Sequence, residues 1–378
     1  MSAAPQTSPP LEIAQRLAVE FDSRAEEADR LGRLPPEDIS ALHSSGFAAF
    51  SVPKAYGGSE LPLADCVAAQ LELAKGSGST ALIAAMTLHA IGHEREQRSW
   101  PEALFDRLCS DVAGGALLNF AASEPKLGSP ARGGLPLTEA VPSEDGTLLI
   151  NGHKTWITGG DALDHLLVRL RFEAHAAIAW IPSTTEGIRW ERTWGDGLSL
   201  RASNSNDLFL EQVTVPRSHL MEDKPGKAVP NVWFPLLIAA TYLGIALAAR
   251  DAVIRYALER TPTALGKPIA TLPKIQREIG GIDIALKAAK QFLLATASDW
   301  SGDPADARAY LPQTTAAKHL TDVTVRNVTD TALQLAGAAA LERGLPLERY
   351  FRDVRAAPMH PPSGDAALEF VGRNVLGV

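Results

Sequence analysis

Two short segments of the chain combine hydroxyl groups, glycines and, in one case, an aromatic ring. They read ASEPKLGSP (122–130) and NGHKTWITGG (151–160). The side chains able to contact a bound ring are those of Ser123, Ser129, Trp156 and Thr158. An indole covers one face of a planar ring, and hydroxyl groups hydrogen-bond to the ring's edge. The alternative is structural, with the indole in the core and the serines in turns.

Three further positions offer acid–base chemistry. His89 lies in a helical stretch, His360 lies in a proline-rich turn, and Asp365 stands four residues before Glu369. An imidazole changes its charge close to neutral pH and therefore acts as an acid or a base. Each also has a structural interpretation: a helical histidine in a core, a histidine packed near a turn, and two carboxylates on a solvated face.

Composition excludes several classes of protein. Cys66 and Cys109 are the only cysteines, which gives neither a disulfide framework nor a metal-ligand cluster and fits a cytoplasmic protein. A net charge of −8 disfavours nucleic acid and acidic lipid as partners. No glycine-rich nucleotide loop follows a predicted strand. A small molecule is therefore the expected partner, with no metal.

The elements that must position these residues fall into three zones, which predict a mostly α-helical α+β fold. Residues 1–113 show helical periodicity and form a predicted N-terminal helical domain. Residues 114–222 alternate with period two and form a predicted antiparallel sheet or barrel. Residues 223–378 are helical again and form a predicted four-helix bundle. The predicted strands read ALLNFAAS, TLLINGHKTWIT, HLLVRLRF, AAIAWIP and DLFLEQVTV.

Two segments bear on membranes and export. Residues 232–249 are long and apolar enough to cross a membrane, but Arg250 and Asp251 follow at once and no basic loop precedes them. A helix that is apolar all round can also form the centre of a bundle, which is the prediction here. Residues 1–10 lack the basic head and apolar core of a secretory signal.

Five segments, in this order along the chain, resemble those of the acyl-CoA dehydrogenase superfamily. They are SVPKAYGG (51–58), ASEPKLGSP (122–130), NGHKTWITGG (151–160), RASNSNDLFLEQVTVP (201–216) and QLAGA (334–338). The resemblance implies that FAD binds, with its isoalloxazine ring against Trp156 and hydroxyl or amide donors at Ser123, Ser129 and Thr158.

The same resemblance implies an oligomer. Arg260 matches an arginine that reaches the FAD pyrophosphate of a neighbouring subunit, and Gln334 and Gly337 match a turn that meets the neighbour's cofactor. A homodimer or homotetramer is therefore expected. The loop after Arg260 is longer than in the family, and Leu265 stands where the family has Phe, so FMN remains an alternative to FAD.

The catalytic base of the family is missing. Pro361 falls where the family usually has a glutamate, and Phe234 falls at a second known location for the base. The family's CoA-contacting D-x-x-R pattern is also absent. Flavin monooxygenases of this family share such losses, and some carry a histidine where His360 stands. His360 or Asp365 can supply a displaced base, and His89 lies on a helix that borders the family's substrate pocket.

Three functions remain open. The first is oxidation of a CoA thioester or related substrate with a displaced base, with an electron-transferring flavoprotein as the electron acceptor. The second is a flavin monooxygenase that receives reduced flavin from a separate flavin reductase. The third is a non-catalytic protein that binds a flavin or an acyl group.

Overall fold

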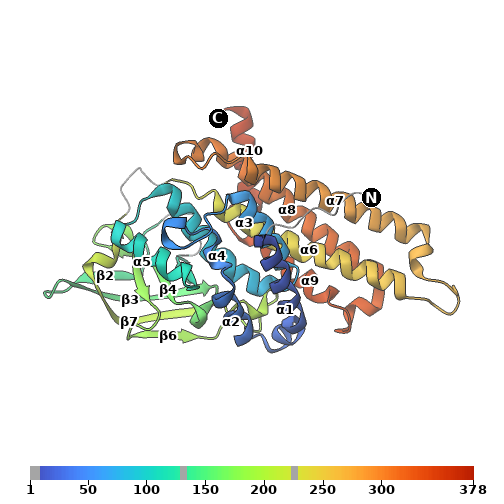
Figure 1. Ribbon diagram of the computed structural model, residues 1–378, viewed down its shortest axis with the longest axis horizontal. Coiled ribbons are helices and arrows are strands. Elements are labelled where there is room, and N and C mark those ends of the chain that lie inside the picture. Colours follow the sequence, from blue (N-terminus) through green and yellow to red (C-terminus); the bar gives the residue numbers. More distant parts are fainter. Residues whose placement is uncertain (1–8, 128–133, 223–228) are drawn as a thin grey trace.

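A computed structural model describes residues 9–127, 134–222 and 229–378. Ser129, one of the predicted flavin contacts, lies outside the described residues. Figure 1 shows the sheet at one end of an elongated molecule, the long helices of the C-terminal part at the other, and the N-terminal helices between them. The three zones expected from the sequence are therefore present in the expected order.

The N-terminal part is helical. Its helices are α1 (Pro9–Leu31), α2 (Pro36–Ser45), α3 (Leu63–Ala74), α4 (Gly78–Gln97) and α5 (Glu102–Ala113). Single residues determine where helices begin and end. Helix α2 begins at Pro36 and is followed by Gly46, whose φ of 75° is that of a left-handed C-cap. At the start of α4 the Ser77 hydroxyl accepts a hydrogen bond from the Thr80 amide. Almost every side chain of α4 is buried, so this helix lies in the core.

The middle part is a sheet. Its strands are β1 (Leu118–Ala121), β2 (Glu139–Pro142), β3 (Thr147–Ile157), β4 (His165–Phe172), β5 (His175–Pro182), β6 (Ile188–Glu191), β7 (Asn206–Pro216) and β8 (Leu220–Glu222). They are ordered β6-β7-β3-β2-β4-β5-β8, with β1 on β4. The pairs β1–β4 and β2–β4 are parallel, so the sheet is mixed, where antiparallel pairing was expected throughout. A short hairpin would force two strands to pair antiparallel. Neither of these pairs is connected by a hairpin, so parallel pairing is possible.

From residue 229 onward, the structure describes three long α-helices and two short ones. They are α6 (Trp233–Glu259), α7 (Pro273–Ser298), α8 (Ala307–Ala336), α9 (Leu347–Asp353) and α10 (Gly364–Leu376). The long apolar helix α6 contacts α3, α4, α7 and α8. Of its most apolar 18-residue window, 83% is buried inside the protein. This burial agrees with the prediction of a core helix.

Gly244 on α6 permits the close contact with α3. A Cβ at this position would lie 2.4 Å from the Leu71 carbonyl oxygen and 2.7 Å from the Ala74 Cβ. We expect Gly244→Ala to lower the free energy of unfolding by about 1–3 kcal/mol, because a packed backbone must move. Gly280→Ala on α7 is the matched control, since nothing lies within 4 Å of its Cβ, and it should be neutral or stabilising. Urea denaturation of both variants measures the difference; equal effects would contradict the packing argument.

Candidate functional site

The end of β3 presents Trp156 to the outside of the sheet. The pairing of β3 with β7 shifts register between Lys154 and Ile157, and Trp156 adopts φ = 61° within this irregularity. A non-glycine residue in the left-handed region costs about 1–2 kcal/mol, so the surrounding structure must hold it there. The indole is 55% exposed. It therefore does not belong to the core, and its face is accessible to a planar ligand.

A buried ion pair fixes the preceding loop against β3. The Lys154 ammonium donates to Glu124 Oε1 at 2.7 Å, and both side chains are almost wholly inaccessible. The amides of Leu137 and Thr138 also donate to the Glu124 carboxylate. Burial alone would raise the pKa of Glu124, but these hydrogen bonds hold it below its ordinary value. The Thr155 amide donates to the Ser123 carbonyl at 3.0 Å, so Ser123 and Trp156 lie on adjoining segments.

Thr158 is held by a chain of hydroxyl groups. Its Oγ1 lies 3.0 Å from Ser205 Oγ, which lies 2.7 Å from Ser203 Oγ. The Asn119 amide donates to the Thr158 carbonyl at 2.9 Å. If Ser205 donates to Thr158, the Thr158 hydroxyl keeps its own proton for another acceptor. The exposed indole, this donor and the clamped loop fit the face and edge of a flavin.

The other predicted cofactor contacts lie on the bundle. Arg260 and Gln334 are exposed, and the Tyr256 hydroxyl, near the end of α6, donates to the Ala336 carbonyl, next to Gly337. The ends of α6 and α8 are therefore adjacent. Figure 1 places the connection from α6 to α7 far from the sheet. Within one chain these residues do not meet Trp156.

Both candidate histidines lie around Phe234. The His89 ring centroid is 4.9 Å from that of Phe234, and the His360 centroid is 6.3 Å from it. His89 also stacks on Phe120 and lies 3.3 Å from the Asn231 side-chain nitrogen. The structure thus brings together two imidazoles from distant segments at the position where the family's alternative base would stand.

Neither imidazole is a strong base. Burial lowers the pKa of His89 to about 3. Burial, followed by the positive charge of Lys318, lowers the pKa of His360 to about 3. Both rings are therefore neutral near pH 7. The third candidate, Asp365, lies at the start of α10 and is exposed. Glu369, one turn further along the helix, is exposed as well.

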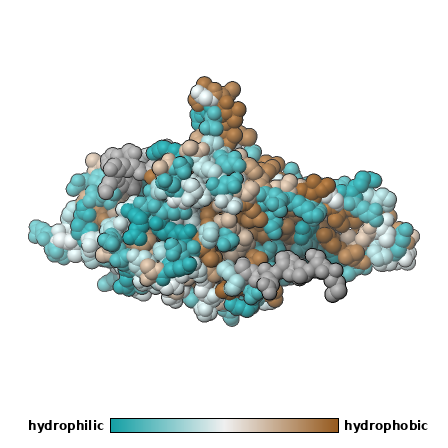
Figure 2. Space-filling model, turned by 45° about the horizontal axis from the view of Figure 1, so that its top comes forward, coloured by the Kyte–Doolittle hydropathy of each residue, from teal (hydrophilic) through white to brown (hydrophobic). Residues whose placement is uncertain are grey.

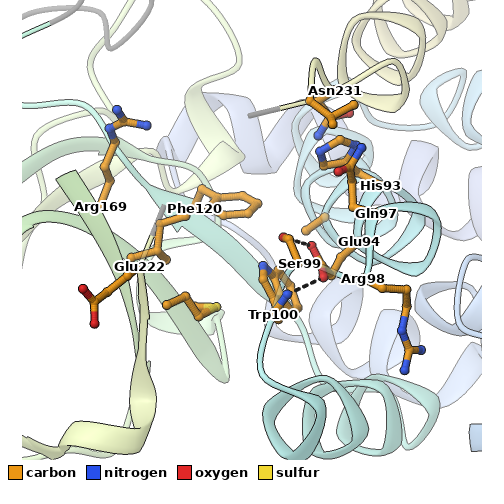
Figure 3. A pocket seen from close by; sticks show the side chains of 14 residues that line it. His93, Glu94, Gln97, Arg98, Ser99, Trp100, Phe120, Arg169, Glu222 and Asn231 are labelled. Carbon is orange, nitrogen blue, oxygen red and sulfur yellow. Dashed lines mark hydrogen bonds between the residues drawn. The ribbon is translucent and has the colours of Figure 1, made fainter. Parts of the chain in front are cut away.

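A cavity of about 490 Å³ lies between the end of α4 and the sheet. Figure 3 shows the Phe120 ring reaching from the sheet side, with His93 and Asn231 on the helix side. Phe120 and Asn231 both line the cavity and contact His89, so the cavity lies beside His89. Sequence patterns missed Phe120, Asn231 and the Lys154–Glu124 pair, although both ion-pair residues stand inside the quoted motifs.

Asp353 links α9 to the loop before β7 and gives a pH-dependent prediction. Its carboxylate accepts from the Leu200 amide at 2.8 Å, and burial raises its pKa to about 6, an effect that Arg349 opposes. Because the folded pKa exceeds the unfolded one, its stabilising contribution is complete below about pH 4 and is lost as pH rises through 6. Asp353→Asn lacks this titration. As pH rises from 4 to 7.5, its free energy of unfolding should therefore increase by about 1–3 kcal/mol relative to that of wild type, as measured by urea titrations at each pH. A pH-independent difference between the two proteins would contradict the raised pKa.

The chain matches family models and a curated relative along most of its length. Models of the N-terminal, middle and C-terminal domains of acyl-CoA dehydrogenase match residues 12–105, 119–213 and 236–362. A putative acyl-CoA dehydrogenase of Bacillus subtilis, YdbM, is 38% identical over 95% of this chain and 94% of its own length.

Two solved structures match along almost the whole chain. A nitrososynthase from Micromonospora carbonacea has a TM-score of 0.85 at 25% identity, covering 100% of this chain and 99% of its own. TdsC from Paenibacillus, solved with FMN and indole, has a TM-score of 0.87 at 23% identity, covering 97% of each chain. The chain therefore belongs to the acyl-CoA dehydrogenase superfamily and is a flavin-dependent oxidoreductase.

Proposed function

We propose that the protein is a flavin-dependent monooxygenase supplied with reduced flavin by a separate flavin reductase. The observation that carries this proposal is that the two imidazoles in contact with Phe234 in the described part of the chain are weak bases. Pro361 and Phe234 occupy the two positions expected to hold a carboxylate, and the imidazoles nearby are neutral and weakly basic. Removal of a proton α to a thioester needs a base with a pKa much closer to the working pH.

Oxygen transfer makes a different demand on the protein. Reduced flavin supplies two electrons to O₂, one oxygen atom enters the substrate, and the other leaves as water. The residues of this chain then have to bind the ring, exclude water and donate hydrogen bonds to oxygen atoms that become negative. Trp156 and Thr158 suit the first task, the apolar surroundings of Phe234 suit the second, and neutral imidazoles suit the third.

The second candidate is dehydrogenation of an acyl-CoA or related thioester, with an electron-transferring flavoprotein as acceptor. The identity of 38% with a putative acyl-CoA dehydrogenase supports it. This candidate needs a base from elsewhere, and the exposed Asp365 is the remaining predicted one. A non-catalytic role in binding a flavin or an acyl group is the third candidate.

The cofactor and the assembly belong to the same proposal. We assign the flavin as FAD if Arg260, Gln334 and Gly337 of a second copy complete the site, and as FMN if they do not. An exposed apolar strip on α10 supports a homodimer or homotetramer, and Figure 2 shows an apolar projection on the surface. The exposed apolar side chains of α10 are Leu368, Val375 and Leu376, and the exposed Val378 follows the helix.

One experiment separates the candidates. The purified protein is saturated with flavin and mixed without oxygen with a panel of acyl-CoAs of different chain length. We expect no bleaching of the flavin. In parallel, chemically reduced flavin and the protein are exposed to oxygen with candidate amine, thiophene and indole substrates, and oxygenated products are sought by mass spectrometry. Bleaching by an acyl-CoA would overturn the proposal in favour of dehydrogenation.

A further inference from the structure

A buried hydroxyl group contacts His360. Tyr242, in the middle of α6, is wholly inaccessible to solvent, and its hydroxyl oxygen lies 2.8 Å from His360 Nε2. The two ring centroids are 5.7 Å apart. His360 Nδ1 has no hydrogen-bond partner in the part of the chain that the structure describes, and the side chain is partly exposed. One ring nitrogen is therefore engaged by Tyr242, and the other is not engaged by any described residue.

We propose that Tyr242 fixes His360 as the neutral tautomer with its proton on Nδ1, so that His360 acts in the site as a hydrogen-bond donor. Tyr242 is thus a positioning residue, which acts through His360. The use of this donor toward oxygen rests on the monooxygenase function proposed above, whereas the tautomer itself rests on the geometry alone.

The proton count supports the direction of the hydrogen bond. His360 Nε2 is the one partner of the Tyr242 hydroxyl among the described residues. If Nε2 carried the proton and donated it, the buried hydroxyl proton would have no acceptor, at a cost of about 1–3 kcal/mol. If the hydroxyl donates to Nε2, the hydroxyl proton has an acceptor, and the ring carries its own proton on Nδ1 of a side chain that is partly exposed.

The charged groups around the pair keep both members neutral. The Lys318 ammonium is buried, donates to the Ala357 carbonyl at 3.2 Å and to Asp322 Oδ2 at 2.7 Å, and disfavours a second positive charge on His360. Burial and the charges of Asp322 and Asp353 raise the pKa of Tyr242, so its hydroxyl keeps its proton. A neutral donor next to a bound ring can stabilise negative charge on oxygen without first losing or gaining a proton.

The consequence concerns the choice of reaction. With Nε2 accepting from Tyr242 and Nδ1 protonated, no lone pair of His360 is free to remove a substrate proton. The same ring therefore cannot be the displaced base of a dehydrogenase, although it remains able to donate. This consequence is independent of the identity of the substrate.

The test is nitrogen NMR of the flavin-loaded protein labelled with ¹⁵N in its histidine side chains, with the His360 signals assigned through His360→Gln. We expect Nδ1 to resonate as a protonated nitrogen and Nε2 as an unprotonated acceptor between pH 6 and 8. In Tyr242→Phe the ring should shift toward the Nε2–H tautomer. Tyr256→Phe is the matched control, because it removes a hydroxyl from the same helix that hydrogen-bonds to a carbonyl.

The outcomes separate this inference from the proposed function. Protonated Nε2 in the wild type, or an unchanged tautomer in a folded Tyr242→Phe protein, would overturn it. Thermal unfolding of each variant reports folding, and Tyr242→Leu, which also lacks a donor, provides a second variant if Tyr242→Phe fails to fold. If the wild-type protein shows the Nδ1–H tautomer but gives no oxygenated product in the product assay, the monooxygenase function is refuted and the inference about the tautomer still holds.

Discussion

Lys154→Met is expected to lower the free energy of unfolding by about 3–5 kcal/mol, because it leaves the Glu124 carboxylate buried without its partner. Lys154 is wholly inaccessible, and Glu124 is only 1% exposed. The lost ammonium contact at 2.7 Å is one of three hydrogen bonds that described residues donate to that carboxylate. The amides of Leu137 and Thr138 remain, but they carry no full charge to compensate the buried anion.

The same variant should also bind flavin poorly. Glu124 follows Ser123 directly, and Lys154 stands two residues before Trp156, so the pair holds both segments of the predicted ring site. Guanidinium chloride denaturation and flavin titration measure the two effects. Arg16→Met is the control, because its partner Glu20 is exposed and such pairs contribute little.

A double variant tests the cause. In Lys154→Met/Glu124→Leu no charge is left unpaired, so part of the lost stability should return. If the double variant is no more stable than Lys154→Met, the uncompensated charge is not the origin of the loss.

The order of the helical, sheet and helical zones could be predicted because it depends on local patterns. β3 was expected as TLLINGHKTWIT and ends at Ile157, and the apolar run that begins at Val232 became the core helix α6. The strands β2, β6 and β8 were missed, since three or four residues give too short a run for an alternating pattern. Their presence depends on pairing with neighbours, which a single sequence does not encode locally.

The contacts within the candidate site could not be predicted from sequence patterns. Tyr242 reads as one more member of an apolar helix, and its partner His360 stands 118 residues away. Likewise Glu124 and Lys154 are 30 residues apart. In each case the chemistry comes from a tertiary contact, whereas the residue types alone allowed several roles. His360 was predicted from its place beside the missing glutamate, but its protonation state depends on Tyr242 and Lys318.

Trp156→Ala is expected to weaken flavin binding by about 30-fold, or about 2 kcal/mol. A flavin lying on the indole would bury roughly 100 Å² of apolar surface, at about 25 cal/mol per Å². The exposed indole makes this surface available, because 55% of the side chain is accessible in the chain by itself. Trp156→Phe should lose less, since a smaller ring still covers part of the face.

The measurement is fluorescence titration of the apoprotein with FAD and with FMN. Trp190→Ala, a partly buried indole on the edge strand β6, is the control and should leave both affinities unchanged. Alanine keeps the Cβ and therefore the same backbone cost at φ = 61°, and the indole is not part of the core, so protein stability should not fall with flavin affinity. Equal flavin affinity in wild type and Trp156→Ala would place the ring elsewhere and remove the basis for every role assigned around it.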